Sequence, residues 1–288
     1  MEFGSALKKI RVSRIIRQEE LSQNLMSRTS ISKIENLKQL PNYTNSVQLI
    51  ERLGLTLNEF EFIKNNYSYS KKQTIEQQFM HIGDSTHQND LLDLKERCLL
   101  YLKKDKDSDV KRIYLITKAM LEIDKKTMKE LCPIVQPVWD YLSKIDTWVI
   151  LDLYMINYIF FFFPSKTSFW MLRLALINIK EKYPELIKLK NSFLLNQSYL
   201  LMQGKKFSRA KSFLEESLTI SKQTAQYDLL ILAKIRICFC DNKENQITKL
   251  LILLHEMGAN SLAEGIKEEL KILKEIKNKA ENQDLISR

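Results

Sequence analysis

The sequence is poor in glycine, proline, cysteine and histidine. Its 288 residues include 6 Gly, 5 Pro, 4 Cys and 3 His, and it lacks alternating β-branched runs bounded by turn signals. Such runs mark strands, and glycine and proline mark the turns between them, so their scarcity argues against a β-rich fold. Leu, Lys, Ile and Glu dominate instead, which favours an all-α protein. At this length two folded units are the natural expectation.

The few cysteines exclude two further classes of protein. Cys98, Cys132, Cys238 and Cys240 form no Cys-x-x-Cys pair, and the last two point to different sides of a helix. We therefore expect neither a disulfide framework nor a zinc site, and reduced thiols in a cytoplasm. No apolar run follows the first basic residues, so no signal peptide is predicted.

Motifs for catalysis and for cofactor binding are missing as well. The sequence has no His-x-x-x-His pair, no phosphate-binding glycine loop and no nucleophile elbow. His81 and His87 flank a turn at Gly83, with Asp84 and Asp90 nearby, but a solvated loop explains this arrangement better than a metal site. We predict no catalytic residue, no metal and no cofactor.

One apolar stretch resembles a membrane span. It covers residues 148–163, WVILDLYMINYIFFFF, and stops at Pro164. A bilayer core requires about 20 apolar residues, and Asp152 and Asn157 interrupt this shorter run. A helix that is apolar on nearly all sides in a soluble protein is a core helix, which is what we predict here.

Residues 16–38 predict two short helices joined by a tight turn. The first covers residues 18–24, Met26-Ser27 forms the turn, and the second covers residues 28–35. The inward positions are Leu21, Leu25, Ile31 and Ile34. Hydroxyl and basic side chains then lie on the outer face of the second helix, where they suit base edges and phosphates. An ordinary helical hairpin with a solvated polar face fits the periodicity equally well.

Positive charge is concentrated in the same region. Residues 5–38 hold eight Lys or Arg against three Glu, and the whole chain has a net charge of +10, which suits a polyanionic partner. We expect Arg28 and Thr29 to read bases, and Gln18, Ser27 and Lys33 to position the phosphate backbone. The full predicted DNA-binding set is Arg14, Arg17, Gln18, Ser27, Arg28, Thr29, Ser30, Ser32, Lys33 and Lys38.

The surrounding residues resemble the five-helix domain of phage-repressor-type regulators, over roughly residues 3–62. The similarity lies in GSALKKIR at 4–11, QEEL at 18–21, SISKIEN at 30–36 and LGLTLNEF at 53–60. The turn after Leu25 is one residue shorter than the common pattern and lacks its usual glycine. In the first helix, Leu7, Ile10 and Ile15 are predicted to point inward, and Lys8, Lys9, Arg11 and Arg14 outward.

Polar residues at 65–72, NNYSYSKK, mark a domain boundary. We expect a DNA-binding domain at 1–65, a linker at 66–72 and a helical-repeat domain at 73–288. Helical pairs recur about every 40 residues, as in stacked helical-hairpin solenoids. The predicted helices are 72–82, 88–103, 107–123, 127–142, 146–163, 166–182, 185–203, 207–223, 226–240, 243–257 and 260–279.

One repeat is legible within this domain. The pattern Asn196-x2-Tyr199-x4-Gly204-x2-Phe207-x2-Ala210 resembles a degenerate tetratricopeptide repeat. Its small residues are expected to let two helices cross closely while the phenylalanine fills the space between them. The last helix has one apolar stripe, which suits either capping of the solenoid or pairing with another subunit; its members are Leu262, Ile266, Leu270, Leu273 and Ile276.

Together the two halves resemble the Rgg/GadR/MutR group of Gram-positive transcriptional regulators, with the PlcR type as the nearest alternative. The resemblance implies a homodimer that binds double-stranded operator DNA and senses a short, apolar signalling peptide, as in quorum sensing, with no membrane partner. A protein-interaction scaffold with a degenerate DNA-binding head is the open alternative. The basic and hydroxyl set from Arg28 to Lys33 separates the two, because a degenerate head would lose it.

The resemblance to PlcR-type regulators also implies a peptide-binding residue. In those regulators, an Asn eleven residues before the aromatic residue of a repeat faces the groove. In this sequence Asn196 precedes Phe207 by eleven residues. An amide offers both donor and acceptor to an extended peptide. Asn157 is a second candidate, although either amide could instead satisfy a neighbouring loop. The predicted pocket residues are Tyr154, Tyr158, Tyr199 and Phe193, with Arg173 or Arg236 meeting a terminal carboxylate.

Overall fold

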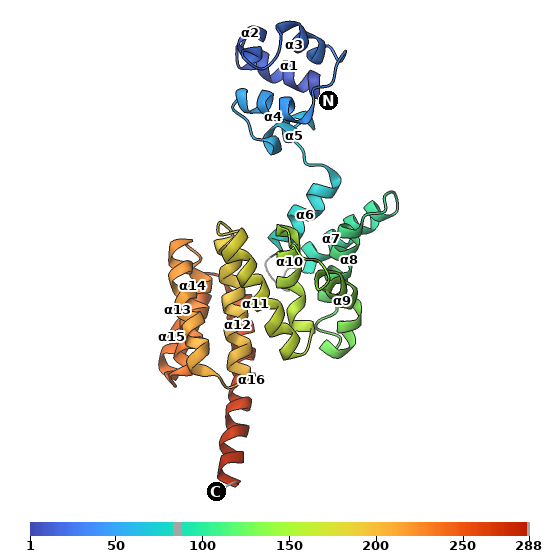
Figure 1. The fold of residues 1–288 in the computed structure, drawn as a ribbon. Helices are drawn as coiled ribbons and strands as arrows, with labels where there is room; N and C mark the ends of the chain where they lie inside the picture. The colour runs from blue at the N-terminus through green and yellow to red at the C-terminus, as the bar shows by residue number, and fades with distance from the viewer. Residues whose placement is uncertain (83–87, 287–288) are drawn as a thin grey trace. The chain divides into compact units, whose positions relative to one another are not determined.

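A computed structural model describes residues 1–82 and 88–286, with side chains as far as residue 278. Every regular element in these ranges is a helix (Figure 1), which confirms the predicted all-α class. The chain divides into two compact units, Met1–Gln78 and Phe79–Arg288. The division falls inside α6 (Lys71–His81), so it comes after the linker that we predict at residues 66–72.

The N-terminal unit contains five helices ahead of α6. They are α1 (Phe3–Ser13), α2 (Gln18–Ser22), α3 (Arg28–Glu35), α4 (Tyr43–Arg52) and α5 (Leu57–Lys64). Three of them begin at a side chain that accepts a hydrogen bond from the first turn: Ser27 for α3, Asn42 for α4 and Thr56 for α5. The helices enclose one core, whose buried members include Leu7, Ile10, Leu21, Ile31, Ile34, Leu49 and Phe60.

Several helices in this protein end in a left-handed residue that is not glycine. The backbone φ is 59° at Ile15, 61° at Leu37 and 59° at Lys205. After each one, the next N–H reaches back five residues to a carbonyl, as Ile16 does to Arg11, which satisfies an orphan group of the helix end. The conformation turns Ile15 outward and leaves it 91% exposed, so its predicted inward position is wrong.

The C-terminal unit is a succession of antiparallel helices close to the predicted spans. They are α7 (Gln88–Leu102), α8 (Ser108–Met120), α9 (Met128–Leu142), α10 (Ile150–Ile159), the 3-10 turn η1 (Phe160–Phe162), α11 (Ser165–Lys182), α12 (Ile187–Gln203), α13 (Phe207–Gln223), α14 (Tyr227–Cys240), α15 (Glu244–Glu256) and α16 (Asn260–Ile286). Each helix from α10 to α16 contacts the next, as a solenoid of helical hairpins requires.

The apolar stretch at residues 148–163 lies in the core, as predicted, but it is not one continuous helix. The Trp148 indole N–H donates to the Leu142 carbonyl at 2.9 Å, and the Asp152 carboxylate accepts the Val149 N–H at 2.9 Å. These bonds fix a non-helical entry, so α10 begins only at Ile150. No helix in the described ranges is long and apolar enough to cross a bilayer.

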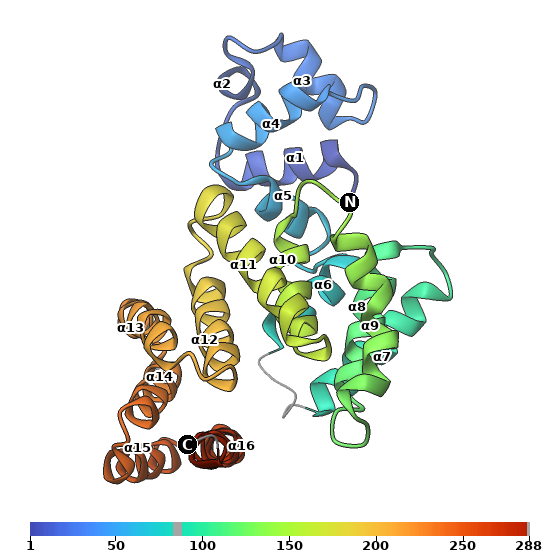
Figure 2. The ribbon, with the colours of Figure 1, turned by 60° about the horizontal axis from the view of Figure 1, so that its bottom comes forward.

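The helices from α10 onward form two faces, seen in Figure 2. Helices α12, α14 and α16 follow the inner side of the arc, and α11, α13 and α15 the outer side. Arg236 of α14 links the inner helices directly, because it bonds both Glu269 of α16 and the Leu195 carbonyl of α12. We call the side formed by α10, α12, α14 and α16 the inner face, and the other side the outer face.

One packing prediction needs correction, and one pair of alternatives is decided. A Cβ added at Gly204 would come no nearer than 3.5 Å to other atoms, so close packing does not require this glycine, whereas Ala210 is fully buried as expected. In α16, the side chains of Ile266, Leu270 and Leu273 are buried in the core of the unit. The stripe therefore caps the solenoid, and these three residues cannot also form a contact with another subunit.

Candidate functional site

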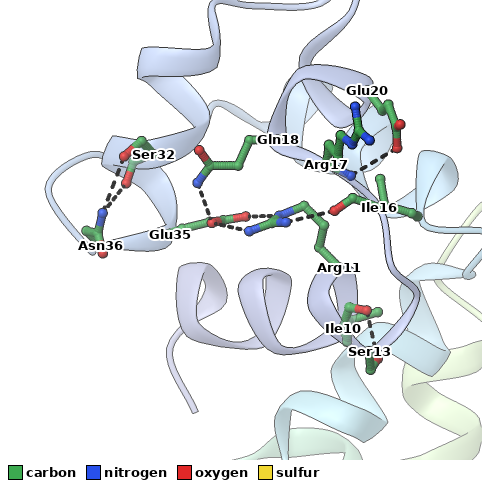
Figure 3. A network of polar contacts seen from close by, with 10 residues as sticks. All are labelled: Ile10, Arg11, Ser13, Ile16, Arg17, Gln18, Glu20, Ser32, Glu35 and Asn36. Atoms are coloured by element: carbon green, nitrogen blue, oxygen red, sulfur yellow. Dashed lines mark hydrogen bonds and ion pairs between the residues drawn. The ribbon is translucent and has the colours of Figure 1, made fainter.

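Three side chains from three helices meet behind the exposed surface of α3 (Figure 3). The Glu35 side chain is only 1% exposed and receives Arg11 Nε at 2.5 Å and Arg11 Nη2 at 2.9 Å. Gln18 Nε2 donates to the same carboxylate at 2.8 Å, and Arg11 Nη1 donates to the Ile16 carbonyl at 2.7 Å. A bidentate pair fixes orientation as well as distance, so the network sets the angle between α1, α2 and α3. The hydrogen bond to Glu35 raises the pKa of Arg11, which keeps the guanidinium charged.

This network corrects one expectation and bears on a second. Arg11 is predicted to point outward, but its side chain is mostly buried and bound to Glu35. The Glu35 carboxylate is buried between α1 and α3, and a buried carboxylate needs a cation beside it. Gln18 is predicted to position a phosphate; one N–H of its side-chain amide donates to Glu35, and the second N–H remains for such a contact. The sequence does contain the signal: Glu35 follows Ile31 by four residues, which places it on the buried face of α3.

The surface of α3 presents a polar and basic set to solvent. Arg28, Thr29 and Lys33 are exposed, and the Arg28 side chain is 66% accessible. Its one nearby carboxylate is that of Glu19, at 3.7 Å and equally exposed, so this pair adds little stability and can open for a ligand. Backbone N–H groups at the start of α3 add a partial positive charge at the same end. The arrangement fits phosphate and base contacts.

The three serines of the predicted set also have structural roles. Ser27 Oγ accepts the Ser30 N–H at 3.1 Å and lies 2.9 Å from Ser30 Oγ. Asn36 Nδ2 donates to the Ser32 carbonyl at 2.8 Å, with Ser32 Oγ at 3.4 Å (Figure 3). These bonds define where α3 begins and ends. Hydroxyl contacts to DNA would therefore come from oxygens that already have a partner in the protein.

The remaining predicted DNA-binding residues, Arg14, Arg17 and Lys38, lie outside α3. Arg17 and Lys38 are exposed, the first at the start of α2 and the second just after α3. Arg14 is exposed as well, but its Nη1 lies beside Gly54 at the end of α4, so it points toward a different part of the unit. Arg17 and Lys38 therefore lie at the ends of the two helices of the motif, whereas Arg14 lies beside α4.

The turn between α2 and α3 explains how the chain manages without the usual glycine. Asn24 has a φ of 54°, the left-handed conformation that glycine normally supplies, and asparagine tolerates it better than most residues. The Leu25 and Met26 N–H groups then both donate to the Ser22 carbonyl. As a result α3 starts at Arg28, the residue predicted from the sequence.

A second candidate site lies on the inner face of the C-terminal unit, where the two predicted asparagines meet. Asn196 Nδ2 of α12 donates to Asn157 Oδ1 of α10 at 3.2 Å. Both side chains are partly exposed. Within the described chain this bond leaves Asn157 Nδ2 as a donor and Asn196 Oδ1 as an acceptor, which is the pair that one peptide unit of an extended chain can satisfy.

The predicted pocket residues divide into two groups. Tyr154 and Tyr199 are partly exposed, and burial raises the pKa of both phenols, which stay protonated at neutral pH. Tyr158 and Phe193 are core residues and cannot line a groove. Phe193 is fully buried, and Tyr158 packs on the Phe79 ring and donates its hydroxyl proton to the Ile82 carbonyl.

The two arginines predicted to meet a peptide carboxylate also differ. Arg236 is buried, and its Nε and Nη2 donate to Glu269 at 2.7 Å and 2.6 Å. Its charge is therefore neutralised within the protein, so it does not offer a free carboxylate site. Arg173 is exposed on the outer side of α11, near the Trp170 ring at 5.3 Å, and lies away from the asparagine pair.

No group of three His, Cys, Asp or Glu side chains in the described ranges could hold a metal ion. The turn at Gly83, with Asp84 and His87, lies outside those ranges. All four cysteines are free thiols, and burial raises the pKa of Cys98 to about 12 and that of Cys240 to about 11. These two thiols are therefore poor nucleophiles at neutral pH.

Comparison with known proteins found similarity for the N-terminal helices and for the fold as a whole. Residues 7–60 match the helix-turn-helix family. Over almost the whole chain the fold is similar to that of solved regulators. The chain has their fold.

A candidate transcriptional regulator from Listeria monocytogenes EGD-e gives a TM-score of 0.69 at 17% identity, over 96% of this chain and 98% of that one. PlcR of Bacillus thuringiensis, solved with the peptide PapR7 and DNA, gives 0.69 at 18% identity, over 93% and 98%. The SHP pheromone receptor Rgg2 of Streptococcus dysgalactiae gives 0.63 at 15% identity, over 94% and 99%. Comparison with curated protein sequences gave no match.

Proposed function

We propose that this protein is a transcriptional regulator of the Rgg type. Its N-terminal unit binds double-stranded operator DNA, and its helical-repeat unit binds a short signalling peptide that alters transcription. The observation that carries the proposal is the exposed set Arg28, Thr29 and Lys33 on a helix whose angle is fixed by a buried ion pair. A degenerate head would not need the exposed cations, which argues against the scaffold alternative.

The peptide half of the proposal rests on the inner face. The Asn157–Asn196 pair offers one donor and one acceptor, and Tyr154 and Tyr199 offer partly exposed apolar rings nearby. A bound peptide loses water from its backbone groups and needs partners of this kind in exchange. PlcR, which has this fold, was solved with both a peptide and DNA, which supports the assignment of the two functions to one chain.

The DNA assignment is tested by binding of the purified chain to the DNA upstream of its own gene. Arg28→Ala should cost about 1–3 kcal/mol at a specific site and relax base preference there. Lys33→Ala should weaken binding to all sequences alike and reduce its salt dependence. Lys118→Ala, an exposed cation on α8, is the matched control and should change neither.

Two results would contradict the proposal. If Arg28→Ala folds normally and keeps both affinity and base preference, α3 does not read the DNA. If the unaltered chain binds no DNA at low salt, where phosphate contacts are strongest, the scaffold alternative is favoured instead.

A further inference from the structure

The outer face contains a groove that the proposed function does not use. It has a volume of about 440 Å³ and is lined by residues of α11, α12 and α13. Its apolar surface comes from Phe169 and Ile177 of α11 and Phe213 of α13. The α11 residues recur along one face of that helix, so the groove follows the helix axis over several turns.

Three cations border this groove, and no acidic side chain lines it. Arg173 and Lys180 belong to α11 and Arg209 to α13. Arg209 reaches across to the Phe169 ring at 5.6 Å, and no ion pair holds any of the three within the described chain. Exposed cations on a water-soluble surface are common, but three around one apolar groove without a carboxylate create a local positive field.

A buried residue with an unpaired acceptor lines the same groove. Gln197 of α12 lines it and is only 2% exposed, and its side-chain Oε1 has no hydrogen-bond partner in the described structure. An unpaired buried acceptor costs about 1–3 kcal/mol, which a ligand that donates a hydrogen bond would recover. Because Gln197 follows Asn196 directly, the two side chains point about 100° apart around α12. The groove is therefore separate from the asparagine pair on the inner face.

We propose that this groove docks an extended, acidic and apolar segment of a partner protein. Charge complementarity requires carboxylates beside the three cations, and the apolar lining requires apolar side chains between them. The unpaired Gln197 oxygen requires an N–H donor. An extended backbone presents free N–H groups, whereas a helix uses its own internally, so the acceptor favours an extended segment.

The dimensions agree with a short segment. Phe169 and Lys180 are eleven residues apart on one helix, which corresponds to about 16 Å along its axis. An extended chain covers that distance with about five residues. The groove is on the outer face, where a segment that belongs to a larger folded protein can reach it.

The test uses fluorescence anisotropy of the full chain with a short fluorescein-labelled peptide in which Glu and Leu alternate. A second peptide with Lys in place of Glu is the charge control. The Glu peptide should bind, and the Lys peptide should not. Double replacement Arg173→Glu with Arg209→Glu should weaken binding by roughly tenfold or more. Replacement of Lys249 by Glu, away from the groove, should change the affinity by less than about twofold.

Gln197→Leu separates a docking role from a structural one. It removes an acceptor that has no partner in the protein, so the melting temperature should stay the same or rise, while the affinity for the Glu peptide falls about fivefold. Asn196→Ala should leave this affinity unchanged. This control also distinguishes failure of this inference from failure of the proposed function. Gln197→Leu tests the outer groove, whereas Asn196→Ala tests the asparagine pair on the inner face.

Four outcomes would overturn the inference. The first is no binding of the Glu peptide at about 1 mM, since weaker affinity would not support a docking site. The second is equal binding of the Lys peptide. Binding that survives the double charge reversal would place the peptide elsewhere. Loss of binding with Asn196→Ala would assign it to the inner face.

Discussion

At the scale of single residues, the hydrogen bond between Asn157 and Asn196 connects two helices and leaves one donor and one acceptor for a ligand. Removal of the Asn196 amide deletes the acceptor and frees Asn157 to reorient. We therefore expect Asn196→Ala to weaken peptide binding by about 1 kcal/mol, roughly fivefold. Calorimetry with synthetic peptides encoded by small reading frames beside the gene measures this. Asn178→Ala on α11 is the control, and an affinity that changes less than about twofold for Asn196→Ala would remove the pair from the site.

Asp152 gives a pH-dependent prediction. Burial raises the pKa of its carboxyl, and the nearby charge of Asp109 raises it further. The hydrogen bond from the Val149 N–H and the charge of Arg112 lower it, but by less. Between the unfolded and the raised folded pKa the folded state binds more protons, so stability falls as pH rises through that window. Asp152→Asn keeps an acceptor for the Val149 N–H and removes the charge. Its melting temperature should exceed that of the unaltered chain at pH 7, and the difference should vanish as pH falls below about 4.

The control for this prediction is Asp146→Asn, since Asp146 is exposed four residues before α10 begins. It should melt like the unaltered chain throughout the pH range. If Asp152→Asn instead destabilises the protein at neutral pH, the attraction of Arg112 for the carboxylate exceeds the cost of burying it. The pKa of Asp152 would then be lowered rather than raised.

At the scale of elements, α1 and α3 approach so closely that only glycine fits at their crossing. A Cβ on Gly4 would lie 1.9 Å from the Ile34 carbonyl oxygen. Gly4→Ala should therefore destabilise the N-terminal unit by about 1–3 kcal/mol or more and, because it pushes α1 away from the Arg11–Glu35 pair, should also weaken DNA binding. Thermal unfolding with a DNA-binding assay measures both effects.

Gly265 provides the matched control, because it is also helical but has no heavy atom within 4 Å of a Cβ added there. Gly265→Ala should raise stability by about 0.5–1 kcal/mol through the lower chain entropy of alanine. Equal effects from the two substitutions would show that the crossing of α1 and α3 is not the cause.

The elements themselves were largely predictable, since the 3.6-residue period and turn chemistry gave α3 and most helices of the C-terminal unit within a few residues. Contacts that depend on helix phase were not. Ile15 has an apolar side chain, yet a left-handed helix end turns it outward, and Arg11 is basic, yet a buried carboxylate turns it inward. Phe193 and Tyr158 are predicted to line a groove, but both are buried in the core. The sequence shows that their helices are apolar, but it does not show which neighbouring helix each face contacts.

At the scale of the whole molecule, one helix-turn-helix head contacts too little DNA for tight specific binding. Two heads on half-sites about one helical turn apart, or a multiple of that, are therefore expected, which requires a dimer. The apolar stripe of α16 cannot supply the contact, since its central residues are buried within the chain. Exposed apolar side chains remain nearby, in particular Ile252 and Leu253 on α15. Such side chains lose contact with water when two copies associate, and this favours the dimer.

We therefore expect light scattering to give the mass of a dimer at micromolar concentration. The double variant Ile252→Glu with Leu253→Glu should give the mass of a monomer, because its dimer would have to bury four carboxylates without partners. Leu99→Glu with Leu100→Glu is the matched control: these are also consecutive, exposed residues, but on α7. The control should remain dimeric. The α15 variant should keep its helical content and bind a single half-site weakly. A dimeric α15 variant would move the interface elsewhere, whereas an unaltered chain that is monomeric both with and without DNA would contradict dimerisation itself.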